Sequence, residues 1–189
     1  MSPETLAAAL QIPLARASLW ADPLSAAMAL YAIDSPVRQA AFLAQCGHES
    51  GRFVWLRELW GPTVAQKRYE PPSDKARELG NTQLGDGFRY RGGGLIQNTG
   101  RYNFRVIGQK IGIDLEADPD RITRPDVAAL AAGQFWADHN LNAYADAGSF
   151  LTLSRAINLG NPSSTAMPNG MDDRVLLWTS CRSALGITS

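Results

Sequence analysis

Apolar positions recur at helical spacing along most of the chain, and the most complete pattern lies between Pro36 and Gly51. Ser35 can cap a helix there, and Pro36 suits the first helical position, where its missing N–H is harmless. Phe42 and Cys46 then share one apolar face, because residues four apart lie one above the other on a helix. The pattern predicts a helix that begins at Pro36 and ends before Gly51, with Cys46 as a buried free thiol.

Further helices are predicted on both sides of this one, separated by proline, glycine and aspartate. The expected ranges are residues 2–34 in short pieces with a break at Asp22-Pro23, then 63–69, 73–79, 99–110, 126–139, 149–158 and 171–185. Thr99 is predicted to cap the helix that Gly112 ends. In the last helix, Val175, Leu176 and Trp178 are predicted to face the core.

The segment 81–94 lacks this periodicity and is rich in glycine. Phe88 and Tyr90 alternate with arginines there, so we expect both rings to be buried and residues 85–94 to line a groove. The G-x-G pair lacks the strand–helix context of a dinucleotide site, which argues against phosphate binding. The fold class predicted is mostly α, with at most a small β-hairpin in this segment, in one domain over residues 1–189.

The composition argues against several classes of function. Lys+Arg and Asp+Glu are both 18, so the formal charge is zero and no basic field favours nucleic acid or an anionic membrane. The only histidines are His48 and His139, and no Cys/His cluster has metal-ligand spacing, so neither a metal nor another cofactor is expected. No apolar run approaches the roughly 20 residues that span a bilayer. Met1–Leu10 lacks the basic start of a secretory signal, so we expect synthesis in a cytoplasm.

Glu49 lies at the carboxyl end of the predicted central helix, next to His48. The negative end of the helix dipole disfavours an ionised carboxylate, and burial would raise its pKa further. A carboxyl group that stays protonated near neutral pH can act as a general acid. Spacing alone leaves open that Glu49 is simply a solvated residue at a helix end.

A second carboxylate lies beyond the helix end. Glu58 follows Glu49 by nine positions, and Glu70 lies in the next irregular stretch. If the chain reverses after the helix, Glu49 and Glu58 can face each other across a groove. Inverting glycoside hydrolases hold two carboxyl groups about 6.5–9.5 Å apart, and retaining ones about 5–5.5 Å. Spacing leaves both Glu58 and Glu70 open as the second group.

The chain contains four motifs: H-E-S-G-R-F at 48–53, E-L-W-G-P-T at 58–63, G-D-G-F-R-Y-R-G-G-G-L-I-Q-N-T-G-R-Y-N-F at 85–104 and A-I-N-L-G-N-P at 156–162. In this order they resemble the catalytic-acid motif, second-carboxylate region, central motif and substrate-binding loop of glycoside hydrolase family 19. That family contains chitinases and the lysozyme-like endolysins of bacteriophages, and the second motif resembles its shorter, endolysin-type members. The resemblance implies a lysozyme-like helical domain of the family 19 chitinase type.

The resemblance also implies catalytic roles. Glu49 would protonate the glycosidic oxygen, and Glu58 would activate a water on the opposite face of the sugar. The backbone of Glu58 is expected to be held by apolar neighbours, namely Val54, Trp55 and Leu59. Glu70 lacks such neighbours, so Glu58 is predicted to be the general base.

Other matching residues belong to the substrate groove. Thr99 matches the hydroxyl residue that helps to hold the water. Gln97 and Tyr102 match residues that contact an N-acetyl sugar, and Asn158 matches the asparagine of the binding loop.

Arg174 is predicted to lie near the acid–base pair, and His48 to be a hydrogen-bonding partner near Glu49. Two positions depart from the family pattern. Gly93 stands where the family usually has arginine, and Asn98 stands where an apolar residue is common. Neither is catalytic by the family pattern, so the departures bear on the shape or charge of the groove.

Together these features predict a peptidoglycan-degrading endolysin that cleaves β-1,4 bonds between N-acetylated sugars with inversion. A short chain without a disulfide set or secretion signal favours peptidoglycan over chitin. We expect a monomer that binds neither nucleic acid nor a membrane stably. It would reach the wall from the host bacterial cytoplasm once the membrane is permeabilised. A chitinase is the alternative enzyme, and a catalytically silent wall-binding or virion module is the alternative from another class.

Overall fold

The computed structural model describes residues 1–187, and helices account for most of them. Their bounds are α1 (Pro3–Leu10), α2 (Leu14–Leu30), α3 (Pro36–Glu49), α4 (Val64–Lys67), α5 (Asp74–Glu78), α6 (Asp86–Arg89), α7 (Arg101–Ile111), the 3-10 helix η1 (Pro119–Thr123), α8 (Pro125–Asp138), α9 (Leu141–Asp146), α10 (Phe150–Leu159) and α11 (Met171–Ala184). The prediction of a mostly helical fold is confirmed.

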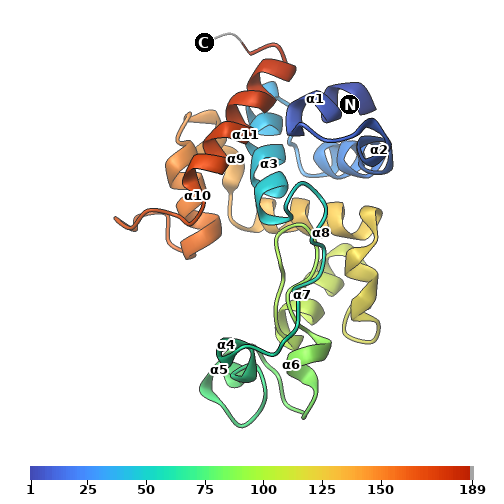
Figure 1. The fold of residues 1–189 in the computed structure, drawn as a ribbon, viewed down its shortest axis with the longest axis vertical. Helices are drawn as coiled ribbons and strands as arrows, with labels where there is room; N and C mark the ends of the chain where they lie inside the picture. The colour runs from blue at the N-terminus through green and yellow to red at the C-terminus, as the bar shows by residue number, and fades with distance from the viewer. Residues whose placement is uncertain (188–189) are drawn as a thin grey trace.

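The helices form a larger and a smaller lobe (Figure 1). In the larger lobe, α3 packs against α11, α1 and α9. The smaller lobe contains α4, α5, α6 and α7. Helix α8 contacts α2 on the side of the larger lobe and α7 on the side of the smaller one. The segment that leaves α3 and leads to α4 therefore passes from one lobe to the other.

The central helix has the predicted ends. The Ser35 side chain accepts a hydrogen bond from the Arg38 N–H, and Pro36 occupies the first turn. Phe42 and Cys46 are fully buried, which anchors this face of α3 in the core. Burial raises the pKa of the Cys46 thiol well above its usual range, so the group stays protonated and behaves as a small apolar side chain.

The predicted break at Asp22-Pro23 is wrong, because α2 runs through it without interruption. An interior proline costs a helix about 3 kcal/mol through its lost hydrogen bond and steric clash. Trp20 and Leu24 are buried on the face that packs against the core. This tertiary packing outweighs the local preference, as it commonly does.

The predicted cap of α7 is also wrong. The helix begins at Arg101 after Gly100, and the Thr99 hydroxyl donates to the Gln97 carbonyl at 3.1 Å instead of capping. The Arg101 N–H donates to the side-chain oxygen of Asn81 at 2.8 Å. Asn81, which is distant in sequence, thus provides the hydrogen-bond acceptor that a local capping side chain would otherwise provide. The predicted end at Gly112 is confirmed.

The inward face of α11 agrees with the prediction at Trp178, which is partly buried and stacks on Phe150, but not at the other two residues. Val175 and Leu176 are 41% and 52% exposed, whereas Arg174, Leu177 and Cys181 are buried. The buried residues are three and four apart, so they share one helical face. Hydrophobicity alone could not reveal this register, because it includes a buried arginine.

The glycine-rich segment folds back on itself near Gly93. Gly93 pairs with Asn98 and with Arg57 in isolated bridges, which is the small β-like element that the sequence allowed. Tyr90 is buried as predicted, but Phe88 is 49% exposed and lies against the guanidinium of Arg91. The expectation of two buried rings is therefore correct only for Tyr90.

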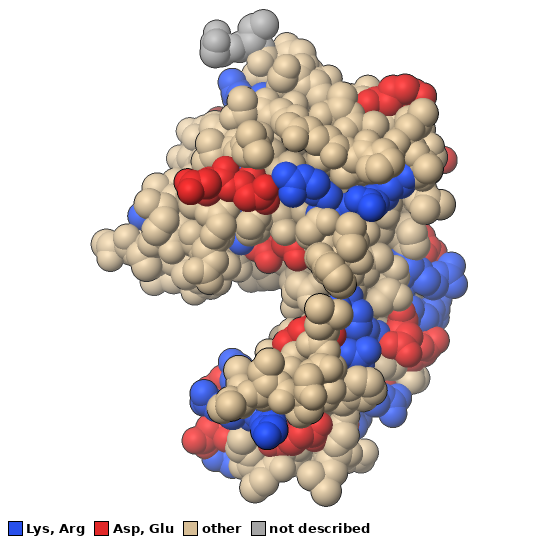
Figure 2. Space-filling model, viewed as in Figure 1, with Lys and Arg blue, Asp and Glu red and all other residues tan. Residues whose placement is uncertain are grey.

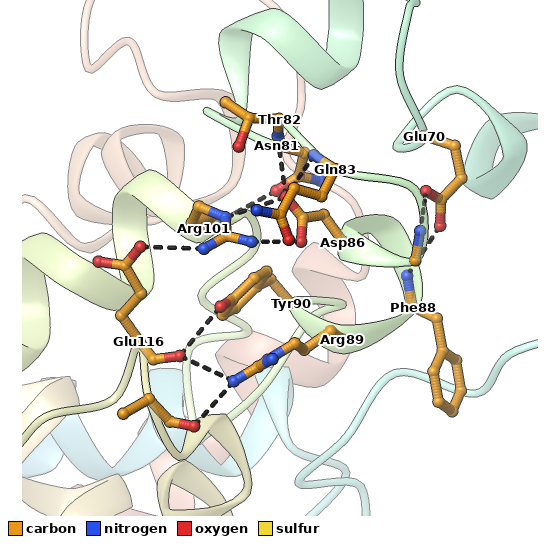
Figure 3. A network of polar contacts seen from close by, with 12 residues as sticks. Glu70, Asn81, Thr82, Gln83, Asp86, Phe88, Arg89, Tyr90, Arg101 and Glu116 are labelled. Carbon is orange, nitrogen blue, oxygen red and sulfur yellow. Dashed lines mark hydrogen bonds and ion pairs between the residues drawn. The ribbon is translucent and has the colours of Figure 1, made fainter.

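A buried carboxylate organises the smaller lobe (Figure 3). Asp86 is 2% exposed and accepts hydrogen bonds from the N–H groups of Thr82 and Gln83 and from two nitrogens of Arg101. Arg101 also donates to Glu116 at 3.1 Å. Burial alone would raise the pKa of Asp86, but the bonds from Arg101 and the two backbone N–H groups outweigh it and lower the pKa.

This network predicts an acid-sensitive contribution to stability. The pKa of Asp86 is lower in the folded state, so its contribution is present above the unfolded pKa of about 3.9 and is lost as pH falls through the folded pKa. Asp86→Asn should lower the free energy of unfolding at pH 7 by about 3–5 kcal/mol, because Arg101 loses its buried partner. Urea unfolding at pH 7 and at pH 3 measures both effects.

The matched control is Asp74→Asn, because the Asp74 side chain is 81% exposed and its ion pair with Arg77 lies at the surface. This change should cost no more than about 0.5–1 kcal/mol. Equal losses for the two variants at pH 7 would contradict the structural role of Asp86.

Candidate active site

The two lobes enclose a hollow that has acidic side chains on both walls (Figure 2). A cavity of about 430 Å³ brings the end of α3 together with the segment that leads to α4. We call it the carboxylate cavity, and its lining residues are Glu49, Trp55, Arg57, Glu58, Leu59, Thr63, Gln66 and Gln97. The structure therefore places the two predicted catalytic carboxylates on one cavity.

Glu49 is held from the larger lobe. It is the last residue of α3, and its side chain is 19% exposed. Arg174 from α11 is 1% exposed and donates to Oε1 of Glu49 and to Oε1 of Gln45. Arg174 also donates to the Asn169 carbonyl at 3.1 Å, and Gln45 donates to Ser154 at 2.7 Å. Arg174 is thus a fixed positive neighbour of Glu49, near the acid–base pair as predicted. The sequence argument about Glu49 considered only the helix dipole and burial and did not include this charge.

Glu58 is held by the glycine-rich segment. Its N–H donates to the Gly92 carbonyl at 2.8 Å, and its Oε2 accepts from the Gly92 N–H at 3.0 Å. Its Oε1 accepts from Gln66 Nε2 at 3.0 Å and lies 3.5 Å from the Tyr69 hydroxyl. The predicted apolar anchors are wrong, because all three are exposed: Val54, Trp55 and Leu59. Backbone pairing fixes Glu58 instead.

Gln66 is a residue that the sequence reasoning missed. It is 4% exposed and its Oε1 accepts from the N–H groups of Gly61 and Thr63, while its Nε2 donates to Glu58 and to the Leu59 carbonyl. The available signal was the T-x-x-Q capping box at the start of α4. Gln66 therefore couples the fold of this loop to the orientation of the Glu58 carboxylate.

Glu70, the competing carboxylate, lies outside the carboxylate cavity. Its two oxygens accept from the N–H groups of Gly85 and Phe88, at 2.8 and 3.2 Å (Figure 3). These bonds hold the start of α6. Glu70 therefore has a structural role at α6 and does not line the cavity with Glu49.

The glycine-rich segment supports the cavity from behind. None of residues 85–94 is among the residues that line the carboxylate cavity, so the expectation that they line the groove is corrected. The segment acts through Gly92, whose backbone approaches Glu58 closely. A Cβ at Gly92 would lie 2.6 Å from the Gln97 side chain, so a larger residue would displace one of the two.

Gln97 and Thr99 lie where the chain turns between two cavities. The Gln97 amide donates to the Trp55 carbonyl at 3.0 Å and lines the carboxylate cavity. Gln97 and Thr99 both line a second, larger cavity. Tyr102 is 51% exposed and lines neither cavity; it packs against Gly80. Their sugar-binding roles stay predictions.

Asn158 bonds to the loop before α11, and His48 bonds to the first turn of α11. Asn158 Oδ1 accepts from the Asn169 N–H at 2.8 Å. His48 Nδ1 lies 2.7 Å from Asp173, which also accepts from Arg52 at 2.9 Å. Burial opposes ionisation of Asp173, but the bonds from His48 and Arg52 outweigh it and lower the pKa. His48 thus bonds to Asp173 rather than to Glu49, and substrate binding by Asn158 and His48 stays a prediction.

Within residues 1–187, no cluster of three or more His, Cys, Asp or Glu side chains is placed to hold a metal ion. The same residues include no helix that is long and apolar enough to cross a bilayer.

A mostly helical fold with two carboxylates on one inter-lobe cavity is an arrangement that suits a glycoside hydrolase, and the similarity to known proteins shows the family. The family model described as chitinase class I matches residues 32–146. A glycosyl hydrolase family 19 domain-containing protein of Haemophilus influenzae is 33% identical over 165 residues, which covers 75% of this chain and 77% of the relative. The chain belongs to glycoside hydrolase family 19.

Plant and bacterial chitinases are also similar to this chain. An endochitinase of Arabidopsis thaliana is 35% identical over 150 residues, but the chain spans only 48% of its length. Among solved structures, chitinase C of Streptomyces griseus superposes with a TM-score of 0.64 at 23% identity, over 88% of this chain and 70% of that one. The class IV chitinase of Zea mays gives 0.63 at 26%, over 88% and 79%. The predicted lysozyme-like fold of the family 19 type is confirmed.

Proposed function

We propose that this family 19 glycoside hydrolase cleaves the glycan strands of bacterial peptidoglycan with inversion, as an endolysin. The observation that carries the hydrolytic part is the shared cavity of Glu49 and Glu58. Glu49 protonates the glycosidic oxygen as the bond breaks. Glu58 takes a proton from a water that attacks the anomeric carbon on the opposite face.

The partners of the two carboxylates suit these roles. When Glu49 loses its proton, the Arg174 guanidinium stabilises the new carboxylate by a charge-assisted bond. Glu58 accepts bonds from Gln66 and Gly92, which orient its carboxylate on the cavity where it can take a proton from water. The proposed acid is thus held by a buried guanidinium, and the proposed base by neutral amide donors.

The preference for peptidoglycan rests on the endolysin-type motif at 58–63 and on the two cysteines, which are both free and buried. The expected cellular role follows from it: a monomer made in the host bacterial cytoplasm that reaches the wall after the membrane is permeabilised. The chitinase alternative is supported by the names of the plant and Streptomyces relatives.

Two substrates separate these functions. Purified peptidoglycan sacculi and colloidal chitin are incubated with the enzyme, and new reducing ends are counted. Release from sacculi with little release from chitin supports the proposal, and mass spectrometry of the muropeptides identifies the bond cut. The reverse preference indicates a chitinase. Binding to sacculi without any release indicates a silent wall-binding module.

Gln66→Glu tests whether Gln66 positions the base. The variant keeps the oxygen that accepts from Gly61 and Thr63 but sets a second carboxylate beside Glu58. Two carboxylates that share a site hold a proton more tightly, so the acidic limb of the pH profile of kcat/KM should move to higher pH by about one unit. Gln109→Glu, on the exposed face of α7, should leave the limb in place. A fall in kcat/KM without any movement of the limb would reduce Gln66 to a structural residue.

A further inference from the structure

The larger of the two cavities that share Gln97 has a volume of about 710 Å³. We call it the distal cavity. Residues of α5, α7 and the end of α8 line it, together with the turn at Ile96–Thr99. Because Gln97 lines both cavities, the distal cavity lies next to the one that holds Glu49 and Glu58.

Charged and apolar side chains meet in the distal cavity. Its charged lining residues are Lys75, Lys110 and Asp138. Lys110 pairs with Asp138 at 2.7 Å, and both side chains are partly exposed, at 41% and 30%. Lys75 pairs with Glu78 at 2.9 Å on the surface. Exposed pairs of this kind are weak, so the two ammonium groups can exchange their partners for carboxylates of a ligand.

His139 adds an acceptor to the same wall. Its ring stacks on Phe135 at a centroid distance of 4.0 Å, and its Nδ1 lies 2.8 Å from the Phe135 carbonyl. A carbonyl can only accept, so Nδ1 carries the proton in this bond. In the neutral ring, Nε2 is then an acceptor for an amide or amine N–H.

Asn98 adds an amide side chain without a hydrogen-bond partner for its nitrogen to the lining of the same cavity. It lines the distal cavity, and its Nδ2 is the one buried side-chain nitrogen or oxygen within residues 1–187 that has no hydrogen-bond partner. The fold uses only its backbone, which exchanges two bonds with Gly93 at 2.8 and 2.9 Å. An unpaired buried amide in a native protein requires an explanation. Because Nδ2 is closed to solvent, the side chain must rotate before a ligand in the distal cavity can bond to this nitrogen.

We propose that the distal cavity binds the stem peptide of peptidoglycan, an inference that rests on the proposed function. Chitin is an uncharged polymer of N-acetylglucosamine. Peptidoglycan carries a short peptide on every second sugar, and this peptide presents amides, free carboxylates and an amine. The two lysines suit its carboxylates, Asp138 its amine, and Asn98 and His139 its amides, while Leu79 and Ile107 pack beneath its alkyl parts.

The test compares intact sacculi with the same sacculi after an amidase has removed the peptides. For the native enzyme, kcat/KM should be about tenfold higher on intact than on stripped material, and added salt should reduce this ratio because the charged contacts are exposed. Lys110→Met and Asn98→Leu should each lower the ratio about threefold to tenfold. Lys67→Met, an exposed lysine on α4 outside the distal cavity, should leave it unchanged.

Equal rates on intact and stripped sacculi would overturn the peptide site and leave the peptidoglycan function standing. A parallel loss on both materials in the Lys110 and Asn98 variants would also overturn it. Absence of new reducing ends from either preparation would instead overturn the proposed function itself. Thermal unfolding of each variant shows that a lowered ratio does not come from a damaged fold.

Discussion

Glu49→Gln is expected to lower the rate of glycan hydrolysis by about 10²–10⁴-fold, the usual contribution of a general acid. Glutamine has nearly the shape of glutamate, and its oxygen can still accept a bond from Arg174, so the end of α3 and the buried chain through Gln45 should persist. The variant removes only the proton that the leaving oxygen needs.

The measurement is the release of reducing ends from sacculi, together with circular dichroism and thermal unfolding of the variant. Glu4→Gln is the matched control, because Glu4 lies in the first turn of α1 and is exposed. It should leave the rate within about twofold of the native enzyme. If Glu49→Gln hydrolyses sacculi at a near-native rate with an unchanged fold, Glu49 is not the acid.

Helix ends were predictable from sequence where a local signal sets them. The cap at Ser35 and the stop at Gly112 lie where they were predicted, because each acts on residues within one helical turn. The α7 start and the continuity of α2 were not predictable in this way. Asn81 reaches Arg101 from a distant part of the chain, and buried packing carries α2 through Pro23.

In the candidate site, too, local motifs were informative and contacts between distant residues were harder to predict. The motifs around Glu49 and Glu58 indicated that the two carboxylates share a groove, and the structure places both on one cavity. Their partners come from elsewhere in the chain: Arg174 is 125 positions from Glu49, and Gly92 is 34 positions from Glu58. The family resemblance pointed to Arg174, whereas no local pattern indicated that Gly92 would bond to Glu58.

The second prediction with a large expected effect compares Glu58 and Glu70 as candidates for the general base. Glu58→Gln is expected to lower the rate of hydrolysis by about 10²–10⁴-fold, because an amide cannot take a proton from the attacking water. Glu70→Gln is expected to cost no more than a few-fold in rate. Its expected loss is in stability, about 0.5–1.5 kcal/mol, because the glutamine oxygen can accept from only one of the two exposed N–H groups that Glu70 now serves.

Both variants are measured for hydrolysis of sacculi and for urea unfolding under one set of conditions. The structure separates the two roles, since Glu58 lines the carboxylate cavity with its carboxylate fixed by Gln66 and Gly92, whereas Glu70 accepts bonds from the backbone at Gly85 and Phe88. A base misplaced by about 1 Å can lose roughly 10²-fold in rate, so the well-held carboxylate on the cavity is the one suited to hold a water in line. If Glu70→Gln abolishes hydrolysis while Glu58→Gln spares it, the general base is Glu70, and the glycine-rich segment rather than the Gln66 loop positions it.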